Sequence, residues 1–372
     1  MSARVYSADA FSEPPSELVA LLDESESDSF FTLPEWFSAV GACGTSARSR
    51  TGLLTNSRCN TGLAYLQGPS CLKSCTNLYT CEFDVLGSRD PADVRLLAQE
   101  IARHPDLPPY INLEGLNSDC STFSAFVKGF REAGLIVKPY RGWATWYEPV
   151  QNLAFERYLE QRPSVLRTTW RRKLKSLEKA AGFKIGVFER DGDIEAFIAA
   201  YEAVERESWK RHEPYPEFIR NLIRLTARKG ALRMGVLSIE NIPAAVQFWI
   251  VWKGRAVIFK LAHAKSFSSH SPGTVLTMHM LRLILDKDSV GEISFGRGDD
   301  PYKKLWASCR RDHWGIEAAN PGRFRGLRPS LRLEAALFRD FLRARPLEKP
   351  PTLKPEPSRQ RFLRNHNGVA AL

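Results

Sequence analysis

The sequence lacks long apolar runs, since no stretch approaches the ~20 residues needed to cross a bilayer. Its first residues, Met1 to Tyr6, carry no hydrophobic signal core. It also has no G-x-S-x-G elbow, no Walker A sequence and no H-E-x-x-H motif. We therefore expect a cytoplasmic protein that uses neither a nucleophile elbow, nor a P-loop, nor a zincin-type metal site.

Cysteines are few and are not spaced as metal ligands. Of the seven cysteines, Cys71, Cys75 and Cys81 form the closest cluster, with Cys59 upstream. This spacing is neither the C-x2-C of zinc ribbons nor that of iron–sulfur proteins. We expect free thiols in a reducing compartment and no metal.

Positive charge is concentrated near the C-terminus. The formal net charge is +11, and residues 321–365 hold twelve Lys or Arg residues against four acids. The rest of the chain is close to neutral, so a nucleic-acid function does not follow from the total. The basic tail, 345–372, is expected to be disordered and could meet an anionic membrane, nucleic acid or an acidic partner.

With 372 residues, 43% of them hydrophobic, the chain is long enough for two cores. We expect an N-terminal domain over 1–150, a basic linking helix within 151–182, a C-terminal domain over 183–320 and a C-terminal helix within 321–344. The linking helix, 163–181, carries Arg and Lys around an apolar stripe. It is either a surface bridge between the halves or an electropositive wall for a phosphate-bearing ligand.

The first half becomes regular after residue 90. The pattern predicts a helix from Asp90, a strand over 110–116, a helix over 121–134 and separate strands over 135–140 and 143–148. This order of strand, helix and strand resembles that of residues 290–318. We expect two similarly built halves, although no residue-level repeat supports the idea.

The second half shows two helices followed by strands. Apolar spacing predicts helices near 194–209 and 216–229, and strands over 183–189, 232–239, 244–252 and 256–263. A polar loop then leads to Pro272 and Gly273, a further helix and a strand at 292–295. Periodicity alone predicts an α+β fold with a mostly antiparallel sheet.

Two loops in this half hold most of the chemistry. Gly273 opens a helix, where unpaired amides and the positive end of the helix dipole suit an anion; the alternative is a simple turn. The stretch from Gly296 to Trp306 brings two adjacent carboxylates, a phenol and two lysines after a strand. The basic cluster of this region could hold phosphates or stay solvated; it comprises Lys303, Lys304, Arg310 and Arg311.

These residues carry a family resemblance. Ser271-Pro-Gly273 before a helix, then Phe295 to Lys304 and Trp306, resembles the GNAT-fold acyltransferases associated with cellulose and exopolysaccharide biosynthesis. These proteins are often labelled CelD-like and are similar in build to the Fem-type aminoacyl transferases. The resemblance covers roughly residues 160–320. It implies tandem GNAT-like domains and direct acyl transfer, without a covalent enzyme intermediate, from acetyl-CoA or another acyl-CoA.

The resemblance also implies site residues and partners. An amine or hydroxyl of a sugar or polysaccharide precursor would be the acceptor, and the basic tail could contact the polysaccharide-synthesis machinery. Asp299 is the expected catalytic base, with His263 as the alternative base or a structural residue. Tyr302 could protonate a departing thiolate or simply pack. The residues expected to bind the cofactor are Ser271, Gly273, Thr274, Lys303 and Lys304.

The expected acceptor-binding residues are Trp209, Arg211, Arg297 and Asp300. Asp300 could instead cap the helix that follows it, and Trp209 could be a core residue or a pocket wall. Of the standard GNAT phosphate pattern, in which Gln or Arg is followed by spaced glycines, only Gly273 fits. An acyl carrier protein or an aminoacyl-tRNA, as in a Fem-like transferase, therefore stays open as the donor. A degenerate, non-catalytic GNAT scaffold is the third reading.

Overall fold

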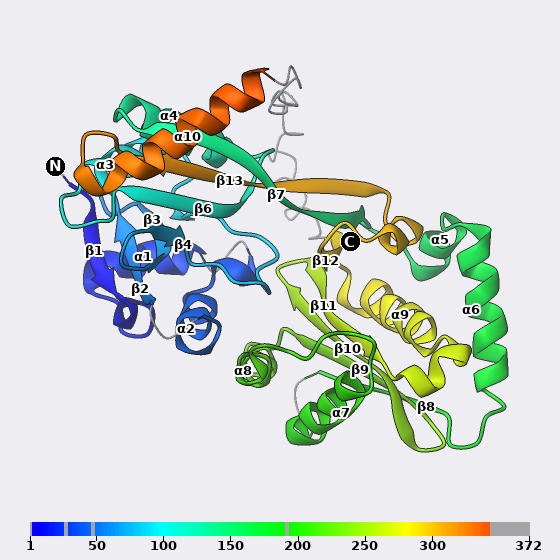
Figure 1. Ribbon diagram of the computed structural model, residues 1–372. Helices are drawn as coiled ribbons and strands as arrows, with labels where there is room; N and C mark the ends of the chain where they lie inside the picture. The colour runs from blue at the N-terminus through cyan, green and yellow to red at the C-terminus, as the bar shows by residue number, and fades with distance from the viewer. Residues whose placement is uncertain (1, 26–28, 46–48, 190–192, 343–372) are drawn as a thin grey trace, which may run out of the picture.

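The computed structural model describes residues 2–25, 29–45, 49–189 and 193–342 (Figure 1). The predicted basic tail, 345–372, lies outside the described residues. No helix within the described ranges is long and apolar enough to span a membrane.

One mixed sheet of thirteen strands runs through the described chain, in the order β1-β2-β3-β4-β6-β13-β7-β12-β11-β10-β9-β8, with β5 paired to β3. Most neighbours are antiparallel, which confirms the predicted α+β fold. The strands are β1 (Arg4–Ser7), β2 (Arg50–Thr55), β3 (Thr61–Gln67), β4 (Leu72–Ser74), β5 (Leu86–Gly87), β6 (Tyr110–Asn117), β7 (Ile136–Pro149), β8 (Lys184–Phe188), β9 (Leu232–Ile239), β10 (Ile242–Trp252), β11 (Arg255–His263), β12 (Glu292–Arg297) and β13 (Cys309–Ala319).

Helices cover both faces of this sheet (Figure 1). The α-helices are α1 (Ser16–Ser25), α2 (Pro34–Cys43), α3 (Pro91–Arg103), α4 (Ser121–Glu132), α5 (Phe155–Glu160), α6 (Ser164–Leu177), α7 (Ile194–Arg206), α8 (Pro216–Arg228), α9 (Pro272–Leu283) and α10 (Phe324–Leu342). Short turns of 3-10 helix include η1 (Ala8–Phe11), η2 (Phe30–Thr32), η3 (Lys265–His270) and η5 (Pro301–Leu305), and the π-helical turn η4 (Ile284–Asp288) extends α9.

Both halves contain the same unit of strand, helix and parallel strand. In the first half β4 and β6 are parallel and α3 connects them; in the second half β11 and β12 are parallel and α9 connects them. All other named strand pairs are antiparallel in the described chain. The repeated unit is thus a matter of topology, which explains why no sequence repeat reveals it.

The two halves share strands rather than standing apart. β13 lies between β6 and β7, and the far end of β7 pairs with β12, so the two long strands run across both halves (Figure 1). The prediction of two strands over 135–148 is wrong, because β13 pairs with β7 from Ile136 to Tyr147 and a single bulge absorbs the Arg141-Gly142 step.

Two apolar clusters fill the space around the sheet. One joins the first half to α7 and α8, where Trp36 meets Phe218 at 5.5 Å and Tyr79 stacks on Phe218 at 5.0 Å between ring centroids. The other lies between the sheet and α5, α6 and α9, around Trp249 and Phe295. Aromatic contacts of this kind add to burial and hold the halves together.

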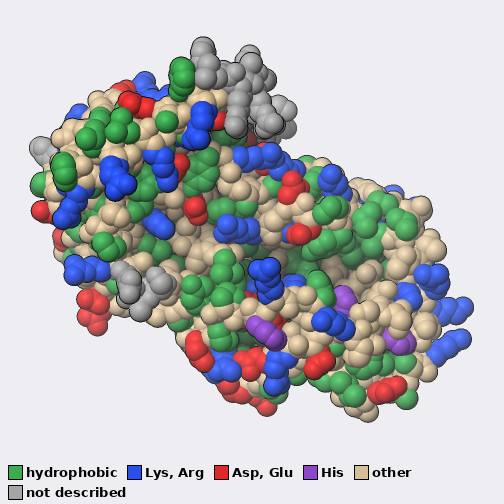
Figure 2. Space-filling view, viewed as in Figure 1, with side chains coloured by type: hydrophobic (Ala, Val, Ile, Leu, Met, Phe, Trp, Pro, Cys, Tyr) green, Lys and Arg blue, Asp and Glu red, His purple; other side chains and the backbone are tan. Residues whose placement is uncertain are grey.

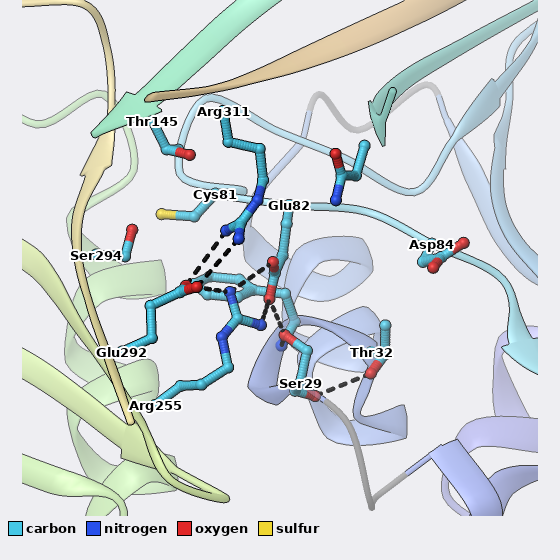
Figure 3. A network of polar contacts seen from close by, with 12 residues as sticks. Ser29, Thr32, Cys81, Glu82, Asp84, Thr145, Arg255, Glu292, Ser294 and Arg311 are labelled. Carbon is cyan, nitrogen blue, oxygen red and sulfur yellow. Dashed lines mark hydrogen bonds and ion pairs between the residues drawn. The ribbon is translucent and has the colours of Figure 1, made fainter. Parts of the chain in front are cut away.

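A charged network joins the halves at the centre of the molecule (Figure 3). Arg255 of β11 pairs with Glu82 at 2.8 Å and with Glu292 of β12 at 3.1 Å, and Arg311 of β13 pairs with Glu292 at 3.0 Å. Ser29 donates a further hydrogen bond to Glu82. Although burial opposes ionisation, Arg255 lowers the pKa of Glu82 to about 2.

The predicted cysteine cluster consists of free thiols. Cys75 and Cys81 are buried and Cys71 is half-buried. Burial raises the pKa of Cys71 and of Cys81 to about 11, so these thiols hold their protons at neutral pH.

Candidate functional site

A cavity opens where two parallel strands stop pairing. β11 and β12 pair only from Arg255, opposite Glu292, to Val257, opposite Ser294. Beyond that point, a cavity of about 540 Å³ is lined by the later residues of both strands and by the start of α9. We call this the strand cavity; Leu166 of α6, Phe295 and Trp306 give it apolar walls.

A bulge helps to separate the strands. The pairing of β12 with β7 shifts between Ser294 and Arg297, and Gly296 has a φ of +67°. A Cβ at Gly296 would lie 2.7 Å from the carbonyl oxygen of Ile258, which is closer than real Cβ contacts come. Glycine is therefore required here by both the backbone conformation and the near approach of β11.

The first turn of α9 faces this cavity. Gly273 lines it, and a Cβ placed on Gly273 would lie 3.5 Å from His263 Nδ1. The next two amides of this turn are already used, because Thr274 N and Val275 N donate to the Ser271 carbonyl oxygen at 3.1 and 3.3 Å. The Gly273 amide has no partner among the hydrogen bonds of the described chain. Of these amides, only that of Gly273 is therefore left to donate to a ligand.

Buried polar groups fix that turn to the sheet. Thr277 Oγ1 donates to the Gly273 carbonyl oxygen at 2.8 Å, and Gln247 Nε2 of β10 donates to Thr277 Oγ1 at 2.5 Å. Trp249 Nε1 in turn donates to Gln247 Oε1 at 2.8 Å. Because Gln247 and Trp249 are almost fully buried, this chain of hydrogen bonds positions the helix start.

His263, at the end of β11, lies on the cavity wall beside an aromatic ring. Trp209 is 49% exposed and its ring centroid is 4.2 Å from that of His263. Burial and the nearby Lys210 lower the pKa of His263 from its ordinary value of 6.5. The imidazole is therefore mostly neutral at pH 7 and can accept a proton.

Lys210 lines the strand cavity, although the sequence analysis selected only its neighbours, Trp209 and Arg211. Lys210 Nζ donates to the Leu261 carbonyl oxygen at 2.5 Å and lies 5.7 Å from the Trp209 ring. Arg211 is exposed and does not line the cavity. The helix α7 ends at Arg206, before Trp209, Lys210 and Arg211. Helical periodicity therefore could not show which of these residues face the cavity.

Lys303 supports the loop of the site. Its side chain is only 3% exposed, and Nζ donates to the carbonyl oxygens of Gly296, Arg297 and Gly298 at 3.3, 2.9 and 3.1 Å. An ion pair with Asp300 at 3.3 Å completes the set. Lys303 lines the cavity, but these contacts already use its ammonium group.

The two adjacent aspartates point to different places. Asp299 is exposed and lies outside the cavity lining; it accepts hydrogen bonds from Trp146 Nε1 at 2.7 Å and Arg310 Nη2 at 3.0 Å, which lower its pKa. Asp300 lines the cavity and precedes η5, as a cap would, but its side chain makes no capping hydrogen bond. A carboxylate held by an arginine and an indole is a weak proton acceptor.

Of the remaining predicted residues, Tyr302 and Arg297 line the cavity and Lys304 does not. Tyr302 lines the cavity, and burial of the phenol together with Asp300 raises its pKa to about 12, so it keeps its proton. Arg297 lines the cavity, donates to the Asn77 carbonyl oxygen at 3.0 Å and lies 3.7 Å over the Trp143 ring. Lys304 is exposed, lies outside the lining and is 5.6 Å from the Trp146 ring.

The structure thus brings together most of the predicted site. The predicted residues that line the strand cavity are Trp209, His263, Ser271, Gly273, Thr274, Arg297, Asp300, Tyr302 and Lys303. Those outside its lining are Arg211, Asp299 and Lys304.

The basic helix α6 lies at the rim of this region. Leu166 contributes to the cavity, and Lys173 Nζ donates to the Ser269 carbonyl oxygen of η3 at 2.5 Å. Among its other cations, Arg171, Arg172 and Lys175 are exposed and Arg167 is half-buried. Figure 2 shows Lys and Arg side chains gathered at the edge where α6 lies. The helix is therefore both a structural bridge and a basic surface.

Comparison with known proteins identifies the fold. Residues 164–304, which include α6 and all residues lining the strand cavity except Leu305 and Trp306, match the family model described as an acetyltransferase (GNAT) domain. The match supports a transferase of the GNAT acyltransferase type. Curated proteins gave no sequence match to this chain.

Solved structures of similar fold extend the likeness to nearly the whole chain. The structure of FemX has a TM-score of 0.58 at 11% identity, covering 85% of this chain and 97% of FemX. The C-terminal domain of a lysylphosphatidylglycerol synthetase from Agrobacterium fabrum, described as putative in its name, has a TM-score of 0.53 at 11% identity, covering 89% of this chain and 96% of that domain. L-PGS from Bacillus licheniformis has a TM-score of 0.53 at 12% identity, covering 87% of this chain and 96% of that one. The tandem GNAT-like fold is thus confirmed.

Proposed function

We propose that the chain is an acyltransferase that binds acetyl-CoA or another acyl-CoA in the strand cavity and transfers the acyl group directly to an amine or hydroxyl. The observation that carries this proposal is the separation of β11 from β12 in front of α9, inside the segment that matches the GNAT domain. The apolar walls suit an acyl chain and its thioester, while the Gly273 amide faces the end where phosphates would bind.

The proton chemistry falls to His263 in this proposal. A neutral imidazole on the cavity wall can take the proton of the attacking amine or hydroxyl, directly or through one water. Tyr302, which keeps its proton at neutral pH, is the group that could donate to the departing thiolate. Asp299, the base expected from the sequence, is paired with Arg310 outside the cavity lining, and in this proposal it positions Trp146 and Arg310.

Binding measurements test the donor site. Titration calorimetry with acetyl-CoA and coenzyme A should show binding to the wild type and its loss in Gly273→Asp, because the added carboxylate repels phosphate at the helix start. The control is Ser16→Asp, which places a carboxylate at the start of α1, away from the cavity. Circular dichroism checks that both variants fold. An unchanged affinity in a folded Gly273→Asp protein, or no binding by the wild type, would reject the coenzyme A site.

The acceptor class rests on the family resemblance in the sequence. We propose an amine or hydroxyl of a sugar or polysaccharide precursor, tested by release of coenzyme A in the presence of amino sugars, sugar hydroxyls and simple alkylamines. Turnover only with alkylamines would reject a sugar acceptor while leaving acyl transfer intact.

A second candidate is aminoacyl transfer from an aminoacyl-tRNA. Two observations favour it: the fold likeness to FemX and lysylphosphatidylglycerol synthetase, and the exposed cations of α6 beside the site. Binding of tRNA should then weaken steeply with salt and with Arg171→Glu and Arg172→Glu combined. Coenzyme A binding without salt-sensitive RNA binding would reject this candidate.

A further inference from the structure

A second cavity lies between the helices α7 and α8. Its volume is about 310 Å³, and it shares no lining residue with the strand cavity. We call it the helix cavity. Its apolar wall is formed by Ile198, Ile219 and Ile223, and three acidic residues line it as well. Arg206, His212 and Arg220 also line it, so the cavity has apolar and charged walls, which suits a small ligand of mixed character.

Two of the three acids are already neutralised by close partners. Glu213 accepts from Lys260 Nζ at 2.5 Å, from Tyr79 OH at 2.6 Å and from Tyr201 OH at 3.2 Å. Glu202 pairs with Arg220 at 2.5 Å. Both carboxylates therefore already have a cationic partner.

Glu205 is different. It is only 8% exposed, and its Oε1 is buried without a hydrogen-bond partner in the described chain. Among the residues that the structure describes, its ion contact is with His212 Nδ1 at 4.0 Å, on a side chain that is 82% exposed. The Glu205 carboxylate also acts on Lys260 over a longer distance, but that ammonium is bonded to Glu213. Burying a carboxylate without a close partner is costly, so the site is electrostatically incomplete.

From this imbalance we propose that the helix cavity binds a small organic monocation, a primary ammonium or a guanidinium on a short aliphatic stem. The cation pairs with the Glu205 carboxylate, and the aliphatic stem packs on the three isoleucines. A hydrated metal ion fits less well, because isoleucines form much of the wall and no group of three or more metal-ligating side chains occurs among the described residues.

This site does not depend on the proposed acyl transfer. The two cavities nevertheless share the connection between α7 and α8: Trp209 and Lys210 line the strand cavity, and His212 and Glu213 line the helix cavity. A ligand in the helix cavity would therefore bind beside the segment that forms one wall of the other cavity.

The first test compares charged and neutral ligands of one shape on the wild type. Calorimetry or ligand-observed NMR with n-butylammonium, n-butylguanidinium and n-butanol should show at least tenfold tighter binding of the two cations. Equal affinity for the alcohol, or no binding of either cation, would overturn the proposal. This comparison needs no variant, so it holds even if a substitution impairs folding.

The second test removes the charge. Glu205→Gln should weaken cation binding at least tenfold and leave butanol unaffected, with the fold checked by circular dichroism. Glu217→Gln is the matched control, because Glu217 is 61% exposed, pairs with Arg220 and does not line the cavity. Cation affinity that is unchanged in a folded Glu205→Gln protein would overturn the assignment to Glu205.

Discussion

At the scale of single residues, the site is defined by contacts that sequence motifs do not encode. Asp299 and Asp300 are neighbours in the chain, yet one pairs with Arg310 outside the cavity lining and the other lines the cavity. Lys303 and Lys304 differ in the same manner, since only Lys303 is buried. A sequence shows that such residues are available near a strand end, but side-chain direction is decided by the turn of η5.

The role of His263 gives the first prediction. His263→Ala should lower the rate of acyl transfer by about 10²–10⁴-fold, as loss of a general base does. In the wild type the rate should fall at acidic pH, because only the neutral ring accepts a proton, and this fall should begin at a lower pH than for an ordinary imidazole, because burial and Lys210 lower the pKa of His263. The variant should lose this acidic limb.

The measurement is the rate of coenzyme A release between pH 5 and 9. His104→Gln serves as the control, because His104 lies beyond α3 in the first half and does not line the strand cavity. A normal rate and an unchanged pH profile in folded His263→Ala would mean that another group takes the proton.

Asp299 gives the second prediction. Asp299→Asn should reduce the rate by less than about tenfold, because the proposed general base, whose loss costs 10²-fold or more, is His263. The single amide oxygen of the variant can still accept from one of the two donors, Trp146 or Arg310, so the loop keeps part of its support. The same release assay measures it. A loss as large as that in His263→Ala would restore Asp299 as the base.

At the scale of elements, the sequence predicts most helices and strands but not how strands from distant parts of the chain pair. The apolar spacing in α4, α8 and α9 predicts those helices, and the alternation in β11 predicts that strand. β13 joins β6 and β7, which both lie more than 150 residues earlier, through long-range pairing that no local pattern reports. The opening of the strand cavity has the same origin, because it depends on where the β11–β12 pairing ends.

The anchoring of α9 gives the third prediction. Gln247→Leu should lower the free energy of unfolding by about 1–3 kcal/mol, because it leaves the buried Trp249 Nε1 without an acceptor and removes a donor to Thr277. It should also weaken coenzyme A binding, since the Gly273 turn loses support. Urea unfolding and calorimetry measure the two effects.

The control for this change is Gln99→Leu, which removes a hydrogen bond to Glu132 on the surface at 2.8 Å. That variant should retain both stability and affinity within error. Full stability in Gln247→Leu would show that the helix start does not depend on the buried hydrogen bonds.

At the scale of the whole molecule, one sheet and one charged network make the halves a single structure. Glu82 comes from the first half, while Arg255, Glu292 and Arg311 come from three strands of the second (Figure 3). The strands β7 and β13 add continuous pairing across the same boundary. Two linear domains, 1–150 and 183–320, describe the order along the chain, whereas the sheet interleaves them. We therefore expect one cooperative unfolding transition.

Glu82 provides the last prediction. Its pKa of about 2 lies below the ordinary value of 4.5, so ionisation of Glu82 stabilises the fold above pH 4.5, and this contribution is lost as the pH falls towards 2. Glu82→Gln should lower the free energy of unfolding at pH 7 by roughly 2–3 kcal/mol, because Arg255 loses its nearer carboxylate. The difference from wild type should shrink steadily as the pH falls from 4.5 towards 2. Glu195→Gln, which removes an exposed ion pair with Arg224, should change stability far less, because solvent screens that pair. Urea unfolding across this pH range measures the free energy of unfolding of each protein. If the difference between Glu82→Gln and wild type stayed constant with pH, the effect of Glu82 would come from packing rather than from charge.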